Sequence, residues 1–264
     1  MKFEEYGDRQ NPVMVMLPGA LCPGESLAYL YERLQKEYDI IIPEYSGQYE
    51  SASYSEFSTA KEEAAKIVLF LKERGIDRVA MIYGQSVGAG IGIELLRQLA
   101  GTEIVVHRAF FDAAACKRGS KYVSLLLFYL VRRFVNLIRR KPTDRLLKKK
   151  WIHLLTNGDP ESLRHVLEGI RKVVPVLSEE TMRKETAAIF SYEFPVLMEN
   201  LQRRLYFFYG RKDITCRLFR KSVEKAYPFA QLQVLDGYGC LNFSVRRTED
   251  YIAMMKRIME LGEE

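Results

Sequence analysis

VAMIYGQSVGAG, at residues 79–90, is the segment that decides the fold. Its first half is a continuous apolar run typical of a buried strand in a parallel sheet, and a helix is predicted from Val87 onward. The pattern G-x-S-x-G falls at the junction, so Ser86 lies in a sharp turn between strand and helix. We expect a strained backbone at Ser86, with Gly84 and Gly88 required because larger side chains would collide there.

Apolar runs and helical patterns alternate along the rest of the chain. Strands are predicted at 13–17, 40–42, 78–83, 104–106, 205–208 and 232–235. Helices are predicted at 26–38, 55–74, 87–100, 218–227 and 248–261. This alternation favours an α/β fold with a doubly wound, mostly parallel sheet and right-handed crossovers.

Residues 117–200 interrupt the alternation with helical, basic segments. We find no pattern for a strand between Val106 and Leu205, and prolines at 142, 160 and 175 divide the segment into several helices. The economical interpretation is a helical cap inserted after the strand near residues 104–111. The predicted organisation is therefore a core of residues 1–116 and 201–264 with a cap of residues 117–200.

Composition and charge limit the classes of protein. The chain has 264 residues, of which 48% are hydrophobic, so it can bury a sizeable core. The net charge is +6, and residues 117–150 carry twelve Lys or Arg against one acid, Asp144. These cations could form the solvated faces of cap helices, or they could attract acidic substrates or the anionic headgroups of a membrane at its periphery. No motif supports a nucleic-acid partner.

The sequence predicts neither a membrane span nor a secretion signal. The most apolar stretch, residues 122–131, is about half the roughly 20 residues that a transmembrane helix needs. The charged first residues lack the apolar run of a signal peptide, so we expect a cytoplasmic location. The oligomeric state stays open.

Three further landmarks surround the serine motif. Pro18-Gly19-Ala20-Leu21 follows the first apolar strand, and Gly210-Arg211-Lys212-Asp213 follows a later one. The last predicted strand leads into Asp236-Gly237-Tyr238-Gly239-Cys240. In this order and spacing, the landmarks resemble those of the α/β-hydrolase family.

That resemblance implies the chemistry of a serine hydrolase. Ser86 would be the nucleophile and Asp213 the acid of the catalytic triad. The N–H groups of Ala20, or alternatively Leu21, and of Val87 would stabilise the oxyanion. The substrate would be a small ester-like or other acyl molecule, and no cofactor or metal is implied.

Cys240 stands where the family has its catalytic histidine. A thiol has a reference pKa of about 8.5, and a neighbouring carboxylate such as Asp213 would raise it, so Cys240 is a poor replacement for imidazole. One hypothesis is a hydrolase of impaired activity, or one that uses another base. The alternative is a catalytically inactive protein that binds an acyl or lipid-like ligand. A third is an active hydrolase whose histidine has been replaced.

Several other residues have both a functional and a structural interpretation. His153 and His165 in the cap could lean over Ser86 or be ordinary surface residues, whereas His107 at a strand end suggests packing. Asp112 could substitute as the triad acid or be a structural loop residue. The four cysteines, at 22, 116, 216 and 240, follow predicted strands. They are expected to be free thiols, with thiol chemistry or a soft-metal site as alternatives.

Overall fold

The structure is a computed structural model that describes residues 1–50, 55–117, 119, 121–239 and 241–261. In this part of the chain one sheet has the strand order β1-β3-β2-β4-β5-β6-β7. Strand β1 pairs antiparallel to β3, and the other neighbours pair in parallel. The strands are β1 (Lys2–Tyr6), β2 (Val13–Leu17), β3 (Asp39–Glu44), β4 (Arg78–Gln85), β5 (Val105–Asp112), β6 (Leu205–Gly210) and β7 (Gln231–Leu235).

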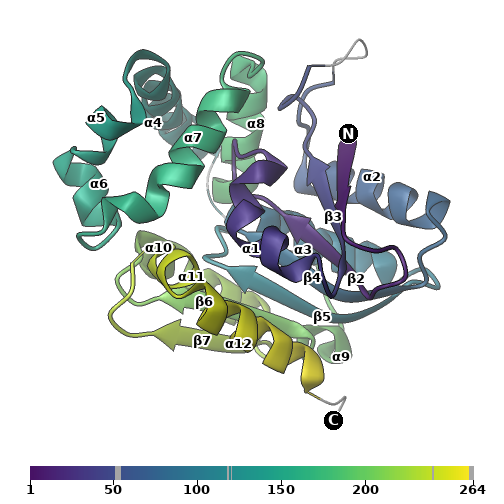
Figure 1. Cartoon of the computed structure of the whole chain (residues 1–264). Helices are drawn as coiled ribbons and strands as arrows, with labels where there is room; N and C mark the ends of the chain where they lie inside the picture. The colour runs from purple at the N-terminus through teal and green to yellow at the C-terminus, as the bar shows by residue number, and fades with distance from the viewer. Residues whose placement is uncertain (51–54, 118, 120, 240, 262–264) are drawn as a thin grey trace.

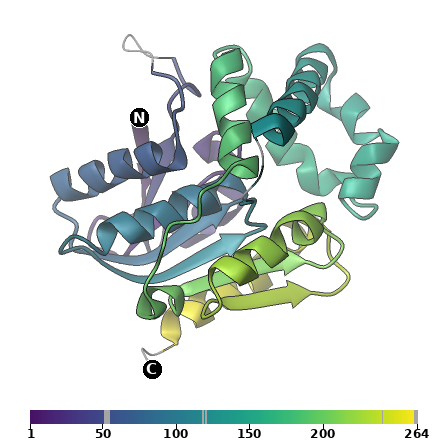
Figure 2. The ribbon, with the colours of Figure 1, turned by 180° about the vertical axis from the view of Figure 1, so that it is seen from behind.

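Helices cover both faces of the sheet (Figures 1 and 2). One face packs against α1 (Ala28–Leu34) and α12 (Thr248–Glu260), preceded by η1 (Gly24–Leu27) and α11 (Asn242–Arg246) respectively. The other face packs against α2 (Ala60–Glu73), α3 (Val87–Leu99) and α10 (Ile214–Ala226), with the short α9 (Glu199–Gln202) near its edge. The predicted α/β class with a mostly parallel sheet is therefore confirmed.

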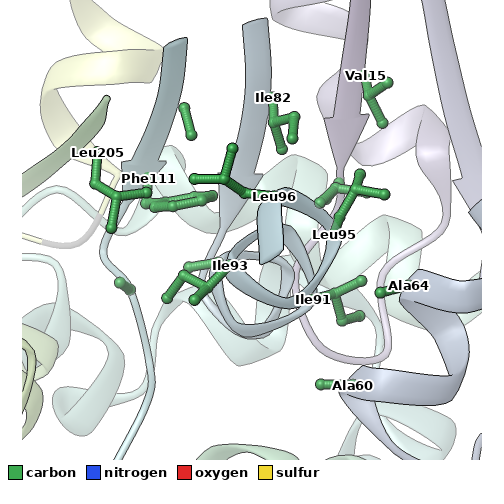
Figure 3. Close-up of a cluster of buried hydrophobic side chains, with 14 of the residues drawn as sticks. Val15, Ala60, Ala64, Ile82, Ile91, Ile93, Leu95, Leu96, Phe111 and Leu205 are labelled. Atoms are coloured by element: carbon green, nitrogen blue, oxygen red, sulfur yellow. The ribbon is translucent and has the colours of Figure 1, made fainter. Parts of the chain in front are cut away.

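Helix α3 packs on the sheet, and α2 packs beside it (Figure 3). It is buried along most of its length, with Ile91, Ile93 and Leu95 fully buried and with Arg97 and Gln98 partly exposed near its C-terminal end. Its glycines allow the close packing, since a Cβ on Gly92 would lie 2.5 Å from the Phe111 ring. The helix that begins just after Ser86 is thus fixed against the sheet.

The cap helices lie between β5 and β6 in the chain and form one lobe beside the sheet (Figures 1 and 2). They are α4 (Lys121–Arg140), α5 (Thr143–Leu147), α6 (Lys150–Leu155), η2 (Pro160–Leu163), α7 (Arg164–Val173) and α8 (Glu179–Phe190). Their hydrophobic cluster includes Leu21 and Cys22 from the loop after β2, so the cap rests on that loop. Among the described helices, none is long and apolar enough to cross a membrane.

Several predicted boundaries are wrong. The apolar run at 104–106 covers only the start of β5, whose end at Asp112 agrees with the strand near residues 104–111 that the cap was predicted to follow, and β1 was not predicted. Helix α2 starts at Ala60 instead of residue 55 because the Thr59 side chain caps it by accepting the Glu62 N–H. Helix α10 starts at Ile214, four residues before the predicted start, because Asp213 caps it. The predicted helix at 26–38 begins as η1 and ends at Leu34.

Candidate functional site

Ser86 occupies a strained turn between β4 and α3. Its φ is 54° and its ψ is −112°, in a region that a residue with a side chain rarely adopts. A Cβ on Gly84 would lie 2.7 Å from the Gly88 carbonyl oxygen, and one on Gly88 would lie 2.4 Å from that of Leu17. Both glycines are therefore required by close backbone contacts. We call residues 84–88 the serine turn.

The loop after β2, residues 18–23, runs beside the serine turn. Leu17 pairs with Gly84, and the Cβ position of Gly19 lies 3.7 Å from the Ser86 Cβ. The Leu21 N–H donates to Glu185 Oε2 at 2.8 Å, which removes Leu21 as a free donor. Within the described residues, the Ala20 N–H has no acceptor. The N–H of Val87, the first residue of α3, likewise has no acceptor there.

Asp112 ends β5 next to the serine turn, and Asp213 lies in the turn after the neighbouring strand β6. The Ser86 N–H donates to the Asp112 carbonyl oxygen at 2.9 Å. Burial raises the pKa of Asp112 to about 7, and the nearby charge of Asp213 contributes to this rise. The Tyr251 hydroxyl, which donates to Asp112 Oδ2 at 2.9 Å, lowers the pKa in part. Asp213 is buried, and its Oδ1 accepts the Thr215 N–H at 2.8 Å. The bond to Tyr251 favours the structural interpretation of Asp112.

The turn that carries Asp213 contacts the loop after β7, residues 236–239. The Lys212 N–H donates to the Tyr238 carbonyl oxygen at 2.9 Å, and a Cβ on Gly210 would lie 2.5 Å from the same oxygen. Two of the predicted landmarks therefore lie side by side at the ends of β6 and β7. Cys240, predicted at the histidine position, lies outside the described residues.

The three histidines differ in their relation to Ser86. His107 lies inside β5 rather than at its end, and its Nε2 is 2.8 Å from the Met259 carbonyl oxygen, which favours a packing role. His153 is exposed on α6. The His165 ring packs on Tyr29 with 4.9 Å between centroids, and the Tyr29 hydroxyl accepts a hydrogen bond from Gln85, the residue before Ser86. Buried His165 Nε2 has no hydrogen-bond partner in the described structure.

Comparison with known proteins identifies the architecture. The sequence matches no family model and no curated protein. The structure is similar to an alpha/beta hydrolase family protein from Desulfitobacterium hafniense (TM-score 0.72, 18% identity, 98% of this chain and 100% of the other). It is also similar to an esterase from Exiguobacterium antarcticum (TM-score 0.73, 16% identity, 98% of this chain and 95% of the other). A third similar structure is an enol-lactonase from Burkholderia xenovorans (TM-score 0.70, 15% identity, 98% of this chain and 96% of the other).

The chain has the α/β-hydrolase fold. At these identities the similarity concerns the fold alone. Within this fold, the serine turn, the loop after β2 and the turn after β6 lie at the carboxyl ends of neighbouring parallel strands, where open α/β sheets bind their ligands.

The cysteines that the structure describes are dispersed within the hydrolase fold. Cys22 is buried in the cap cluster, whereas Cys116 and Cys216 are buried in the main core cluster. Burial, together with the charge of Glu185, raises the pKa of Cys22 to about 12, and burial also raises that of Cys116. Such thiols are poor nucleophiles and metal ligands. No group of three or more His, Cys, Asp or Glu suited to a metal occurs among the described residues.

Sequence analysis missed the residues by which the cap contacts the site. Glu185 on α8 lies three residues after buried Met182, so the helical period places a carboxylate on an apolar face. A carboxylate at that position could have been recognised from the sequence as a candidate buried group. The contact of His165 with Tyr29 joins segments far apart in the chain, and one sequence gives no sign of it.

Proposed function

We propose that this protein hydrolyses ester-like or other small acyl substrates, with Ser86 as the nucleophile. The observation that carries the proposal is the backbone of Ser86, held at a φ of 54° between two glycines that admit no side chain. Strain of this kind persists where surrounding structure enforces it, and it commonly marks a functional site. The Ser86 side chain is partly exposed, so a substrate can reach it.

The N–H groups of Ala20 and Val87 would stabilise the oxyanion. Val87 begins α3, where the helix dipole favours negative charge. The bond from Leu21 to Glu185 fixes the neighbouring peptide of the loop after β2 and leaves the Ala20 N–H without an acceptor in the described structure. Donors held in place before the reaction need no reorganisation when charge develops.

Proton transfer is the weak step of this mechanism. Asp213 would be the acid, but the sequence has Cys240 where the resemblance calls for the imidazole that accepts the serine proton. Loss of one triad member commonly costs several orders of magnitude and leaves roughly 10³- to 10⁴-fold catalysis over water. Turnover by the unchanged protein is therefore expected to be slow.

His165 is the histidine best suited to act as a substitute base. It is linked to the serine turn through Tyr29 and Gln85, and its Nε2 is free to accept a proton. Burial lowers its pKa to about 4, so the ring is neutral near pH 7 but a weak base. If neither His165 nor Cys240 serves, the protein keeps the site and binds an acyl or lipid-like ligand without turnover.

A fluorophosphonate probe, which reacts with activated serines, tests the role of Ser86. We expect slow labelling at Ser86, located by mass spectrometry, no labelling of Ser86→Ala, and faster labelling of Cys240→His. The histidine would restore the base without altering the glycines or backbone donors. Failure of both the unchanged protein and Cys240→His to react would contradict the proposal.

A further inference from the structure

The first half of α4 is apolar on both of its sides. Phe128 faces inward and is buried in the cap cluster. Tyr122, Leu126 and Leu130 are 86%, 66% and 58% exposed. A helix that packs on one side only normally carries polar residues on the other. This outer face is therefore unlike an ordinary solvated helix surface.

The exposed apolar residues continue into a line of cations. Leu126, Tyr129, Arg133 and Arg140 are three, four and seven residues apart, which places them on one stripe along α4. We call this set, with Tyr122 and Leu130, the α4 stripe. Trp151 of α6 packs on Phe134 of α4 with 5.7 Å between ring centroids, and it remains 39% exposed.

The cations at the end of the stripe are uncompensated. Arg132 pairs with Glu179 at 2.6 Å, and Asp144, the acid of this segment, pairs with Arg164 at 2.9 Å. Within the described residues, Arg133 and Arg140 form no ion pair, and the same is true of the neighbouring lysines 148–150. An exposed apolar surface thus adjoins unpaired positive charge.

We propose that the α4 stripe docks on an anionic phospholipid surface. Leucine and aromatic side chains can enter the boundary between headgroups and acyl chains, where Tyr and Trp are favoured, while arginines bind the headgroup phosphates. A second copy of this chain fits less well. A two-fold contact between α4 stripes would bring uncompensated arginines together in one interface.

Vesicle co-sedimentation tests the proposal. Vesicles of phosphatidylcholine and phosphatidylglycerol in a ratio of about 3:1 should bind the protein at least tenfold more tightly than phosphatidylcholine alone, with weakening by salt. Leu126→Ser with Leu130→Ser, and separately Arg133→Glu with Arg140→Glu, should each weaken binding about tenfold or more. Ser86→Ala should bind as the unchanged protein does, so the result is independent of the proposed hydrolysis.

Helix α2 supplies matched controls. Leu69 is 58% exposed, as Leu130 is, and Lys61 and Lys72 are exposed on the same helix. Leu69→Ser and Lys61→Glu with Lys72→Glu should change vesicle affinity by less than about twofold if the α4 stripe is the contact. The proposal would be overturned if the α4 variants and the α2 variants lost vesicle affinity equally. It would also be overturned if the protein showed no preference for vesicles that contain phosphatidylglycerol. If the unchanged protein instead associates with itself and does not bind vesicles, and the α4 variants abolish that association, the α4 stripe contacts a second copy of the chain and the proposal is overturned.

Discussion

The Glu185 carboxylate is buried between the cap and the loop after β2. It accepts the Leu21 N–H at 2.8 Å and a Gln48 Nε2 hydrogen at 2.7 Å. Burial raises the pKa of Glu185 to about 7, and the nearby charge of Glu63 contributes to this rise. The two hydrogen bonds lower the pKa in part. Since Leu21 adopts a φ of 58°, Glu185 helps to hold a strained peptide next to the proposed oxyanion donor Ala20.

Glu185→Gln is predicted to stabilise the protein at high pH. In the unfolded chain the Glu185 carboxyl has a pKa near 4.3, whereas in the native state its pKa is about 7. Between these pH values the native state binds more protons than the unfolded state, so the native state loses stability as the pH rises. Above pH 7 the full cost of the buried charge is present. Glutamine carries no charge, so the variant's free energy of unfolding should exceed that of the unchanged protein by about 2–4 kcal/mol at pH 8. The difference should fall to about 1 kcal/mol at pH 5 and vanish below about pH 4. Urea unfolding at both pH values measures it.

Glu185→Ala is the contrasting variant. It leaves the buried Leu21 N–H without its acceptor at any pH, so we expect Glu185→Ala to be less stable than Glu185→Gln by about 1–3 kcal/mol at both pH 5 and pH 8. Gln48 can rotate its amide to suit Glu185→Gln, because its buried Oε1 has no partner in the described structure. A Glu185→Gln protein that is less stable than the unchanged one at pH 8 would show that no charge penalty exists.

At the scale of elements, η2 and α11 join the cap to the loop after β7. Asn242 Oδ1 accepts the Gly239 N–H at 2.8 Å, and Asn242 Nδ2 donates to Ser162 Oγ at 3.0 Å. Arg246 pairs with Asp159, which precedes η2. Asn242 is buried, so it fixes Gly239 of this loop with respect to Ser162 of the cap.

Asn242→Ala is predicted to lower the free energy of unfolding by about 2 kcal/mol, because the Gly239 N–H and the Ser162 hydroxyl lose a buried partner. Asn136→Ala, a half-buried asparagine on α4 without a hydrogen bond in the described structure, should change it by less than about 0.5 kcal/mol. Urea unfolding of both variants measures this. Equal effects would show that Asn242 does not clamp the loop.

The elements could be predicted where burial determines the pattern. Strands β2, β4 and β6 are covered on both faces and read as apolar runs. Strand β1 is a half-exposed edge strand with a Lys and two Glu residues, so its composition gave no strand signal. The apolar run at 104–106 marks only the start of β5, because His107 and buried Arg108 interrupt it before the apolar residues 109–111.

At the scale of the whole molecule, the order of the landmarks predicted the fold and the place of the serine turn. The glycine spacing around Ser86 is local, so one sequence suffices to predict it. The parts that were missed, Glu185 on Leu21 and His165 on Tyr29, depend on how the cap sits on the core. The residue roles at the site stay predictions.

Ester hydrolysis tests most directly whether Ser86 belongs to a hydrolytic site that lacks its usual base. Short- and medium-chain p-nitrophenyl esters would be assayed at several pH values with the unchanged protein, Ser86→Ala, His165→Phe and Cys240→His. We predict slow turnover that Ser86→Ala abolishes and that Cys240→His raises by at least 100-fold, the usual scale for a positioned general base. Turnover that survives Ser86→Ala, or the absence of any turnover even in Cys240→His, would contradict the proposed hydrolase.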